Sequence, residues 1–210
     1  MKYTIALLLT LLCLPPAVFS QVHLFQEGVI STGDYETHPA FSPTGDTLYF
    51  LRGLPDANLF SIYVSFKKDG RWTKPQIAPF SGRYVDADPF VTKDGKAVYF
   101  VSNRPVHEGD PVRPDWDIWK VEIAAAGWGQ PIHVDSPINS GSNEYFPTIA
   151  DNGNLYFGSE RRGGKGQSDL YVARRVGGNY ASPENLGDSI NTPESEYEPY
   201  IAPDESYLIF

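Results

Sequence analysis

Short apolar runs rich in aromatic residues recur along the chain, and each follows a turn of polar, glycine or proline residues. A second apolar run follows each of the first three, beyond a loop of variable length. After residue 20 no segment carries a long 3.6-residue apolar period, because glycine or proline interrupts every candidate. The pattern therefore predicts short strands joined by turns. The first runs are LYF (48–50), VYF (98–100), LYF (155–157) and LIF (208–210), and the second are SIYVSF (61–66), DIWKVEI (117–123) and DLYVARR (169–175).

A proline with an acid three residues before it precedes each aromatic run, so the chain contains an internal repeat. The prolines are 50, 58 and 52 residues apart. Units of about 40–50 residues built from short strands are typical of propeller blades. The prolines are Pro39, Pro89, Pro147 and Pro199, and the acids are Glu36, Asp86, Glu144 and Glu196.

Each unit offers four strands, which is the number in a propeller blade. They are the run after the proline, the aromatic run, the second apolar run, and a run around an aromatic residue with a proline three residues on. We predict an all-β, β-propeller fold with about three and a third blades, near 34–84, 85–142, 143–195 and, in part, 196–210. A propeller closes with roughly 4–8 blades. We therefore expect a fragment of a six- to seven-bladed ring, or a chain that a partner completes.

The repeat resembles the WD40-like (PD40) repeat of TolB-type β-propellers. The motifs that carry the resemblance are, in order, E/D-x-x-P, a D/N-G or S-P-x-G turn, L/V-Y-F, an arginine and D-I/L-Y/W. The resemblance covers nearly all of residues 34–210. It implies a propeller exported from a bacterial cytoplasm, commonly a binding or scaffolding module. The sequence departs from the motif at Ser61, where the other units have Asp117 and Asp169, and at 204–205, where a turn glycine is usual.

Residues 1–20 have the layout of a secretory signal peptide. Lys2 supplies a basic start, and 5–14 is an unbroken apolar run that is too short to span a bilayer. Small residues then precede a cut after Ser20, and residues 21–33 form a lead-in to the first repeat. We expect an exported protein, periplasmic or extracellular, without a transmembrane span after cleavage.

The mature chain would be acidic and free of cysteine, because Cys13 is the only cysteine and lies in the leader. Removing Lys2 from 17 basic residues leaves 16 against 26 acidic ones, a net charge of −10. An acidic surface without basic clusters argues against nucleic acid and anionic membranes as partners. Thiol catalysis and cysteine-bound zinc are excluded as well.

No catalytic motif stands out. The chain has no G-x-S-x-G elbow, and its histidines lack H-E-x-x-H spacing. We therefore favour a non-catalytic module that binds a protein or glycan partner, with neither catalytic residues nor a cofactor. Two other classes stay open. One is the N-terminal propeller of an enzyme, such as a glycosidase, a lyase or a prolyl-oligopeptidase-type peptidase, and the other is an envelope protein with a C-terminal peptidoglycan-binding domain.

The repeated acids are interpreted as structural, because a group that occurs once per blade serves the fold. They would bond backbone N–H groups or an arginine where blades meet, and the alternative is that they line the central channel as carboxylates for metal or sugar chemistry. We also expect two ion pairs to close the hairpins, Arg104 with Asp117 and Arg161 with Asp169.

Doubled acids are a further candidate for a metal site. Asp86 with Asp88, and Glu194 with Glu196 and Glu198, could hold calcium through oxygen ligands. They lack the spaced Asp/Asn-Gly loop of a strong calcium motif. We therefore expect no metal.

The loops between the second and third strands differ most among the units, so they are the expected binding rim. They span 53–60, 105–116 and 162–168. An aromatic residue beside polar groups could stack on a sugar or fill a partner's pocket. The other interpretation is that these are solvated hairpin tips. The candidate binding residues are His107, Arg113, Trp116, Arg162 and Lys165.

Adjacent residues of a strand point to opposite faces of the sheet. One member of each adjacent aromatic pair is therefore expected to face the neighbouring blade, and the other to face the opposite side of the sheet. The pairs are Tyr49–Phe50, Tyr99–Phe100 and Tyr156–Phe157.

Overall fold

The computed structural model describes residues 22–54, 59–134 and 136–210, and within them every regular element is a β-strand. The expected signal peptide and its cut, and residues 55–58 of the first variable loop, lie outside the described residues. In the described part no helix is long and apolar enough to cross a membrane. The all-β fold predicted from the sequence is confirmed.

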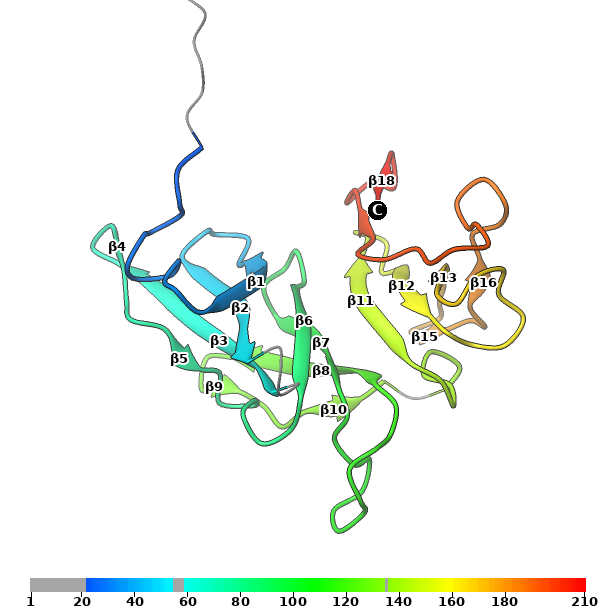
Figure 1. Cartoon of the computed structure of the whole chain (residues 1–210), viewed down its shortest axis with the longest axis horizontal. Helices are drawn as coiled ribbons and strands as arrows, with labels where there is room; N and C mark the ends of the chain where they lie inside the picture. Colours follow the sequence, from blue (N-terminus) through cyan, green and yellow to red (C-terminus); the bar gives the residue numbers. More distant parts are fainter. Residues whose placement is uncertain (1–21, 55–58, 135) are drawn as a thin grey trace, which may run out of the picture.

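Three antiparallel sheets of four main strands, here called blades 1, 2 and 3, follow one another along the chain. The first strands β1, β6 and β11 lie side by side in the middle of Figure 1, and the fourth strands β5, β10 and β16 lie farther out. This is the arrangement of propeller blades around an axis. Blade 1 comprises β1 (Tyr35–Phe41), β2 (Thr47–Leu54), β3 (Leu59–Lys68) and β5 (Gln76–Ile77). Blade 2 comprises β6 (Asp86–Val91), β7 (Ala97–Ser102), β8 (Asp117–Ala124) and β10 (Ile132–His133), and blade 3 comprises β11 (Glu144–Ile149), β12 (Leu155–Ser159), β13 (Asp169–Ala173) and β16 (Glu184–Asn185).

A β-bulge interrupts the first strand of each blade at the repeat proline. The first strand was predicted to follow the proline, and the strand at 200–201 of the fourth unit does so. In blades 1 to 3 the strand begins at or before the repeated acid, so there the boundary was wrong. Pairing with the second strand slips beside the proline in all three blades. The residue before the proline has a positive φ, and its side chain therefore leaves the usual alternation of the strand. These φ values are 50° at His38, 51° at Asp88, 50° at Phe146 and 54° at Glu198.

A short side hairpin follows the third strand in each blade. It contains the aromatic residue that was expected in the fourth strand, so that boundary was also wrong. In blade 1 the turn residues Asp69 and Gly70 both have positive φ, as a tight two-residue hairpin requires. The next proline, Pro75, cannot donate to a ladder, and the fourth strand starts after it. The side-hairpin strands are β4 (Arg71–Trp72), β9 (Gly127–Trp128), β14 (Arg175–Val176) and β15 (Asn179–Tyr180).

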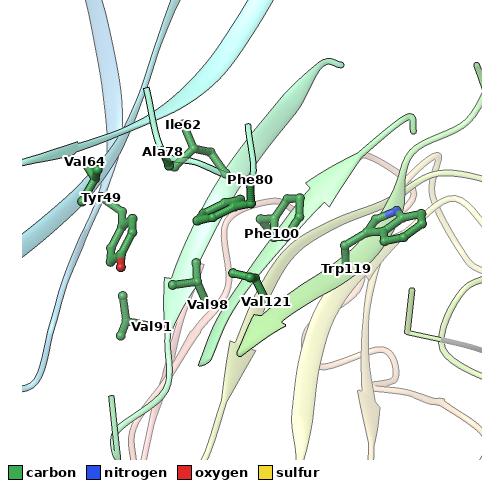
Figure 2. Packing of buried hydrophobic residues seen from close by; sticks show 10 residues of the cluster. All are labelled: Tyr49, Ile62, Val64, Ala78, Phe80, Val91, Val98, Phe100, Trp119 and Val121. Carbon is green, nitrogen blue, oxygen red and sulfur yellow. The ribbon is translucent and has the colours of Figure 1, made fainter. Parts of the chain in front are cut away.

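The strand aromatics join successive blades. Tyr49 of blade 1 packs toward blade 2, where Trp128 Nε1 donates a 2.9 Å hydrogen bond to its hydroxyl. Phe100 of blade 2 points the opposite way, and its ring centroid lies 5.1 Å from that of Phe80 in blade 1. Figure 2 shows this shared core between the two blades. The expected alternation is present: the tyrosine faces the following blade and the phenylalanine faces the preceding one.

The same contacts continue beyond blade 2. Phe157 of blade 3 is fully buried against Ile118 of blade 2, and Tyr156 packs toward Ile201 of the fourth unit. The two strands of that unit pair with each other, and the first of them lies against β11. They are β17 (Tyr200–Ile201) and β18 (Leu208–Ile209).

The described part of the lead-in covers the other side of blade 1. Ile30 is buried in a cluster with Phe50. Phe25 packs edge-on against Trp72, with ring centroids 5.8 Å apart. The lead-in therefore supplies apolar contacts to the face of blade 1 that points away from blade 2.

Candidate functional site

The repeated acids fasten the inter-blade loops to the sheets. Each accepts a hydrogen bond from a hydroxyl four or five residues earlier, and three also pair with an arginine at the end of the second strand. Their carboxylates are thus engaged within the fold. The hydroxyl donors to Glu36, Asp86, Glu144 and Glu196 are Thr32, Ser81, Ser140 and Thr192. The N···O distances are 3.0 Å for Arg52–Glu36, 2.6 Å for Arg104–Asp86 and 3.3 Å for Arg161–Glu144.

The ion pair predicted between Arg104 and Asp117 was wrong. Arg104 pairs with Asp86, whereas Asp117 contacts Arg113 Nε at 3.0 Å and a histidine of β10 at 2.7 Å. Ser102 lies opposite Asp86 on one neighbouring strand and opposite Asp117 on the other. Arg104 is two residues farther along the chain and therefore lies near both carboxylates. The Asp117 carboxylate is already paired with Arg113 of its own loop and with the histidine of the fourth strand.

The pair predicted between Arg161 and Asp169 was wrong for a similar reason. Arg161 pairs with Glu144, which is fully buried. Asp169 instead accepts hydrogen bonds from the backbone N–H groups of Lys165 (2.6 Å) and Gly166 (2.8 Å). The preceding loop thus caps this carboxylate.

The five expected rim residues do not gather into one site. Trp116 turns inward, and its ring lies edge-on to Tyr145 with centroids 5.9 Å apart. Arg113 is held within its own blade by Asp115 at 2.7 Å and by Asp117. Only Trp116 of these two contributes to a cavity at the axis.

The other three rim residues lie on the outer parts of their loops. His107 and Arg162 are exposed. Lys165 is exposed and pairs through Nζ with Asp188 at 3.0 Å. Partner binding by these side chains stays a prediction.

The doubled acids diverge instead of forming one ligand set. Asp86 bonds Arg104, whereas Asp88 turns toward the axis because of the bulge. Among the described residues no group of three or more His, Cys, Asp or Glu is arranged to hold a metal ion.

Four side chains meet at the axis, and each belongs to the residue before a repeat proline. His38 Nε2 lies 3.2 Å from Glu198 Oε1 and 3.8 Å from Asp88 Oδ1. The ring of Phe146 stacks on that of His38 with centroids 5.5 Å apart, and the Phe146 N–H donates to Asp88 Oδ2 at 3.3 Å. The repeated bulge therefore delivers four different side chains to one place.

This axial cluster separates two cavities. The first, called here the aromatic cavity, has a volume of about 190 Å³. The second, of about 140 Å³, is walled by the repeat prolines. His38, Asp88 and Phe146 line both cavities and so form the floor between them. The aromatic cavity is walled by Tyr35, Phe60, Trp116, Tyr145, Phe146 and Tyr197.

Asp88 is the buried carboxylate of this cluster, with a side chain only 5% exposed. Burial raises its pKa to about 6. Attraction to His38 and the hydrogen bond from Phe146 N–H oppose that rise, and repulsion from Glu198 adds to it. The carboxyl group therefore changes charge between mildly acidic and neutral pH.

Asp88→Asn is expected to flatten the dependence of stability on pH. Because the folded-state pKa lies above the unfolded one, the native state holds the proton more tightly; this stabilisation is present below pH 4 and is lost as pH rises through 6. The loss amounts to at most roughly 3 kcal/mol for a shift of about two units. Asparagine keeps the acceptor for Phe146 N–H and tolerates a positive φ. Urea unfolding of both proteins at pH 4 and pH 8 measures the effect, and equal pH dependence in the two would contradict it.

The sequence did carry a signal for the axial residues. Inside the E/D-x-x-P frame, the position before the proline holds His38, Asp88, Phe146 and Glu198, four unlike residues. Variation within a fixed frame marks a position that packing does not restrict. The candidate binding residues were predicted only from variation in the loops between the second and third strands.

Known structures that resemble this chain are β-propeller proteins. TolB from Acinetobacter baumannii superposes with a TM-score of 0.56 and 15% identity, over 85% of this chain and 38% of that one. A puromycin-hydrolyzing peptidase from Mycobacterium tuberculosis gives 0.52 and 16%, over 78% of this chain and 24% of that one. A puromycin hydrolase complexed with PGG gives 0.54 and 13%, over 80% and 24%. This chain thus spans well under half of the length of each of these proteins.

At these identities the likeness shows the fold alone, and the β-propeller prediction is confirmed. No protein-family model matches the chain, and no curated protein matches its sequence. The resemblance to TolB therefore holds for the propeller architecture, while the finer assignment to the PD40 repeat stays a prediction.

Proposed function

We propose that this chain is a non-catalytic binding module, and that the aromatic cavity receives a projecting part of a protein or glycan partner. The observation that carries the proposal is the convergence of six aromatic side chains, from all three blades and the fourth unit, on one cavity at the axis. Binding sites are concave, mostly apolar and fitted with a few polar groups. Here Asp88 and His38 are those polar groups.

The position of the cavity supports the same conclusion. Tyr35 and Tyr145 stand at or next to the beginning of first strands, and Phe60 and Trp116 stand where the variable loops enter third strands. The mouth therefore lies on the face of the propeller that carries those loops. The proposed binding site therefore lies at the centre of that face and not at the loop tips, and the loops surround it.

The sequence also supports binding outside the cytoplasm. The basic start, the apolar run and the small-residue cut are those of an exported protein. The partner would then lie in the periplasm or outside the cell. An acidic chain with net charge −10 after cleavage fits neither nucleic acid nor an anionic membrane surface.

Site-specific photocrosslinking tests the proposal. A photoreactive phenylalanine analogue placed at Tyr197, which is 45% exposed at the cavity mouth, should give a discrete adduct with a protein partner in cells. The same analogue at Val176, which is 64% exposed on a side hairpin, is the matched control. A glycan array probed with the full-length protein covers the other partner class.

Trp116→Ala should abolish the adduct or the glycan signal, because it removes an aromatic wall of the cavity. The circular dichroism spectrum should be unchanged, because this ring is only one wall. Adducts of equal yield from both positions would place binding elsewhere. Binding that survives Trp116→Ala undiminished would overturn the proposal.

A further inference from the structure

The walls of the aromatic cavity form two groups of rings. On one side Trp116, Tyr145, Phe146 and Tyr197 make a continuous series, with successive centroids 5.9, 5.9 and 6.1 Å apart. Tyr35 and Phe60, 6.1 Å apart, belong to the same cavity and come from blade 1. Aromatic ring faces are electron-rich, and several rings around one space attract a cation.

The floor of this cavity carries negative charge. Asp88 Oδ2 accepts the hydrogen bond from Phe146 N–H, whereas Asp88 Oδ1 lies 3.8 Å from His38 Nε2 and accepts no hydrogen bond from the described residues. Glu198, which lines the second cavity, adds a carboxylate 3.2 Å from the same His38 Nε2. Among the residues that the structure describes, no lysine or arginine lines the cavity. Rings and carboxylates together favour a positively charged guest.

We propose that the aromatic cavity recognises the ammonium group of a lysine side chain on a protein partner, with Asp88 as its acceptor and the surrounding rings as its walls. This inference rests on the proposed function, because it names what the cavity selects. It also chooses between the partner classes, since a lysine belongs to a protein.

The acceptor geometry favours an ammonium over a guanidinium. Arginine binds carboxylates best through two parallel hydrogen bonds, one to each oxygen. Asp88 offers its two oxygens unequally, because Oδ2 already accepts the hydrogen bond from Phe146 N–H. This asymmetry suits the compact charge of lysine, whose three N–H donors can rotate to meet one oxygen.

The size of the cavity favours a side chain over a free small ligand. Pockets for small molecules measure about 300–1,000 Å³, and this one measures about 190 Å³. It therefore holds one anchoring group, and the remaining contact area comes from the loops around the mouth. A buried anchor surrounded by a rim is the usual anatomy of a protein–protein contact.

Three capped tripeptides test the inference on the full-length protein: acetyl-Gly-Lys-Gly-amide, its norleucine analogue, and its arginine analogue. Norleucine keeps an unbranched four-carbon chain and lacks the charge. NMR titration to about 10 mM, read at the indole N–H of Trp116, reports binding in this cavity. The lysine peptide should bind at least about tenfold more tightly than the norleucine peptide, from the ring and carboxylate contacts together, and more tightly than the arginine peptide.

Asp88→Asn should remove the preference for lysine, and Asp110→Asn should preserve it, because Asp110 is an exposed acid on the 105–116 loop. In the wild type, lysine-peptide affinity should also rise from pH 5 to pH 7, because burial raises the pKa of Asp88 to about 6 and the carboxyl group ionises over this range. His38 and Glu198 face the same carboxylate and are unchanged in both variants.

Equal binding of the lysine and norleucine peptides, a preference that survives Asp88→Asn, or no binding of any peptide would each overturn the ammonium inference. The proposed function would stand in those cases if the crosslink from Tyr197 still depended on Trp116. If the crosslink did not depend on Trp116 either, the proposed function would be overturned together with the ammonium inference.

Discussion

Phe157→Ala is expected to lower the free energy of unfolding by about 3–5 kcal/mol, the usual cost of truncating a buried phenylalanine. The side chain is fully buried and packs against Ile118 and Ile138 of the preceding blade. Its ring also stacks on Tyr171 at 6.2 Å, with the Arg161 guanidinium 5.1 Å from its centroid. The substitution would open a cavity at the contact between blades 2 and 3. Urea denaturation followed by circular dichroism measures the change.

Val176→Ala serves as the control, because Val176 is 64% exposed and its truncation should alter stability by no more than about 0.5 kcal/mol. If Phe157→Ala left the unfolding midpoint where it is in the wild type, the packing of blade 3 on blade 2 would be wrong.

Glu144→Ala is expected to cost about 3–5 kcal/mol, because it breaks a buried ion pair and removes the acceptor of the Ser140 and Ser159 hydroxyls. Glu144 is fully buried and accepts hydrogen bonds from Ser140, Ser159 and Arg161. Burial raises its pKa in spite of these contacts. Thermal unfolding monitored at neutral pH reports the loss.

Two variants make this test specific. Glu36 holds the same repeat position, but its side chain is 14% exposed, so water can replace part of its contacts and Glu36→Ala should cost less. Glu144→Gln keeps an acceptor oxygen for the hydroxyls and should cost less than Glu144→Ala. A larger loss from Glu36→Ala than from Glu144→Ala would contradict a role for burial.

The propeller could be predicted because its signal is repeated. One L-Y-F run could be any strand, but three copies at similar spacing specify one supersecondary unit that packs on its own copies. Strand alternation then separates Tyr99 from Phe100 without further information. The structure adds the direction, since Tyr99 packs toward Leu155 of blade 3 and Phe100 toward Phe80 of blade 1.

The ends of strands and the ion pairs could not be predicted in the same way. Alternation would place Asp86 and Asp88 on one face, but the bulge between Ala87 and Phe90 contains Asp88 and turns it to the axis. Likewise, sequence distance does not decide whether Arg104 meets Asp86 or Asp117, because both flank its strand. These outcomes depend on tertiary contacts that no single segment encodes.

The candidate site was predicted only in part. Trp116 was chosen as a loop aromatic and does line the aromatic cavity. Arg113 was chosen for its charge, yet two aspartates of its own blade neutralise that charge. The remaining aromatic walls come from different blades and from the segment before β17, which become neighbours only when the blades are arranged around the axis.

The residue with a positive φ before each repeat proline has a consequence for how this propeller could acquire a new ligand specificity. The blade frame, with its acid, proline and aromatic pair, maintains packing, while the position before the proline faces the axis and tolerates histidine, aspartate, phenylalanine and glutamate. Substitutions at that position would change the chemistry of the axis one blade at a time. In the proposed binding module, recognition and folding are thereby encoded at separate positions of the same repeat, so a lineage of such proteins could diversify its ligands while retaining the architecture.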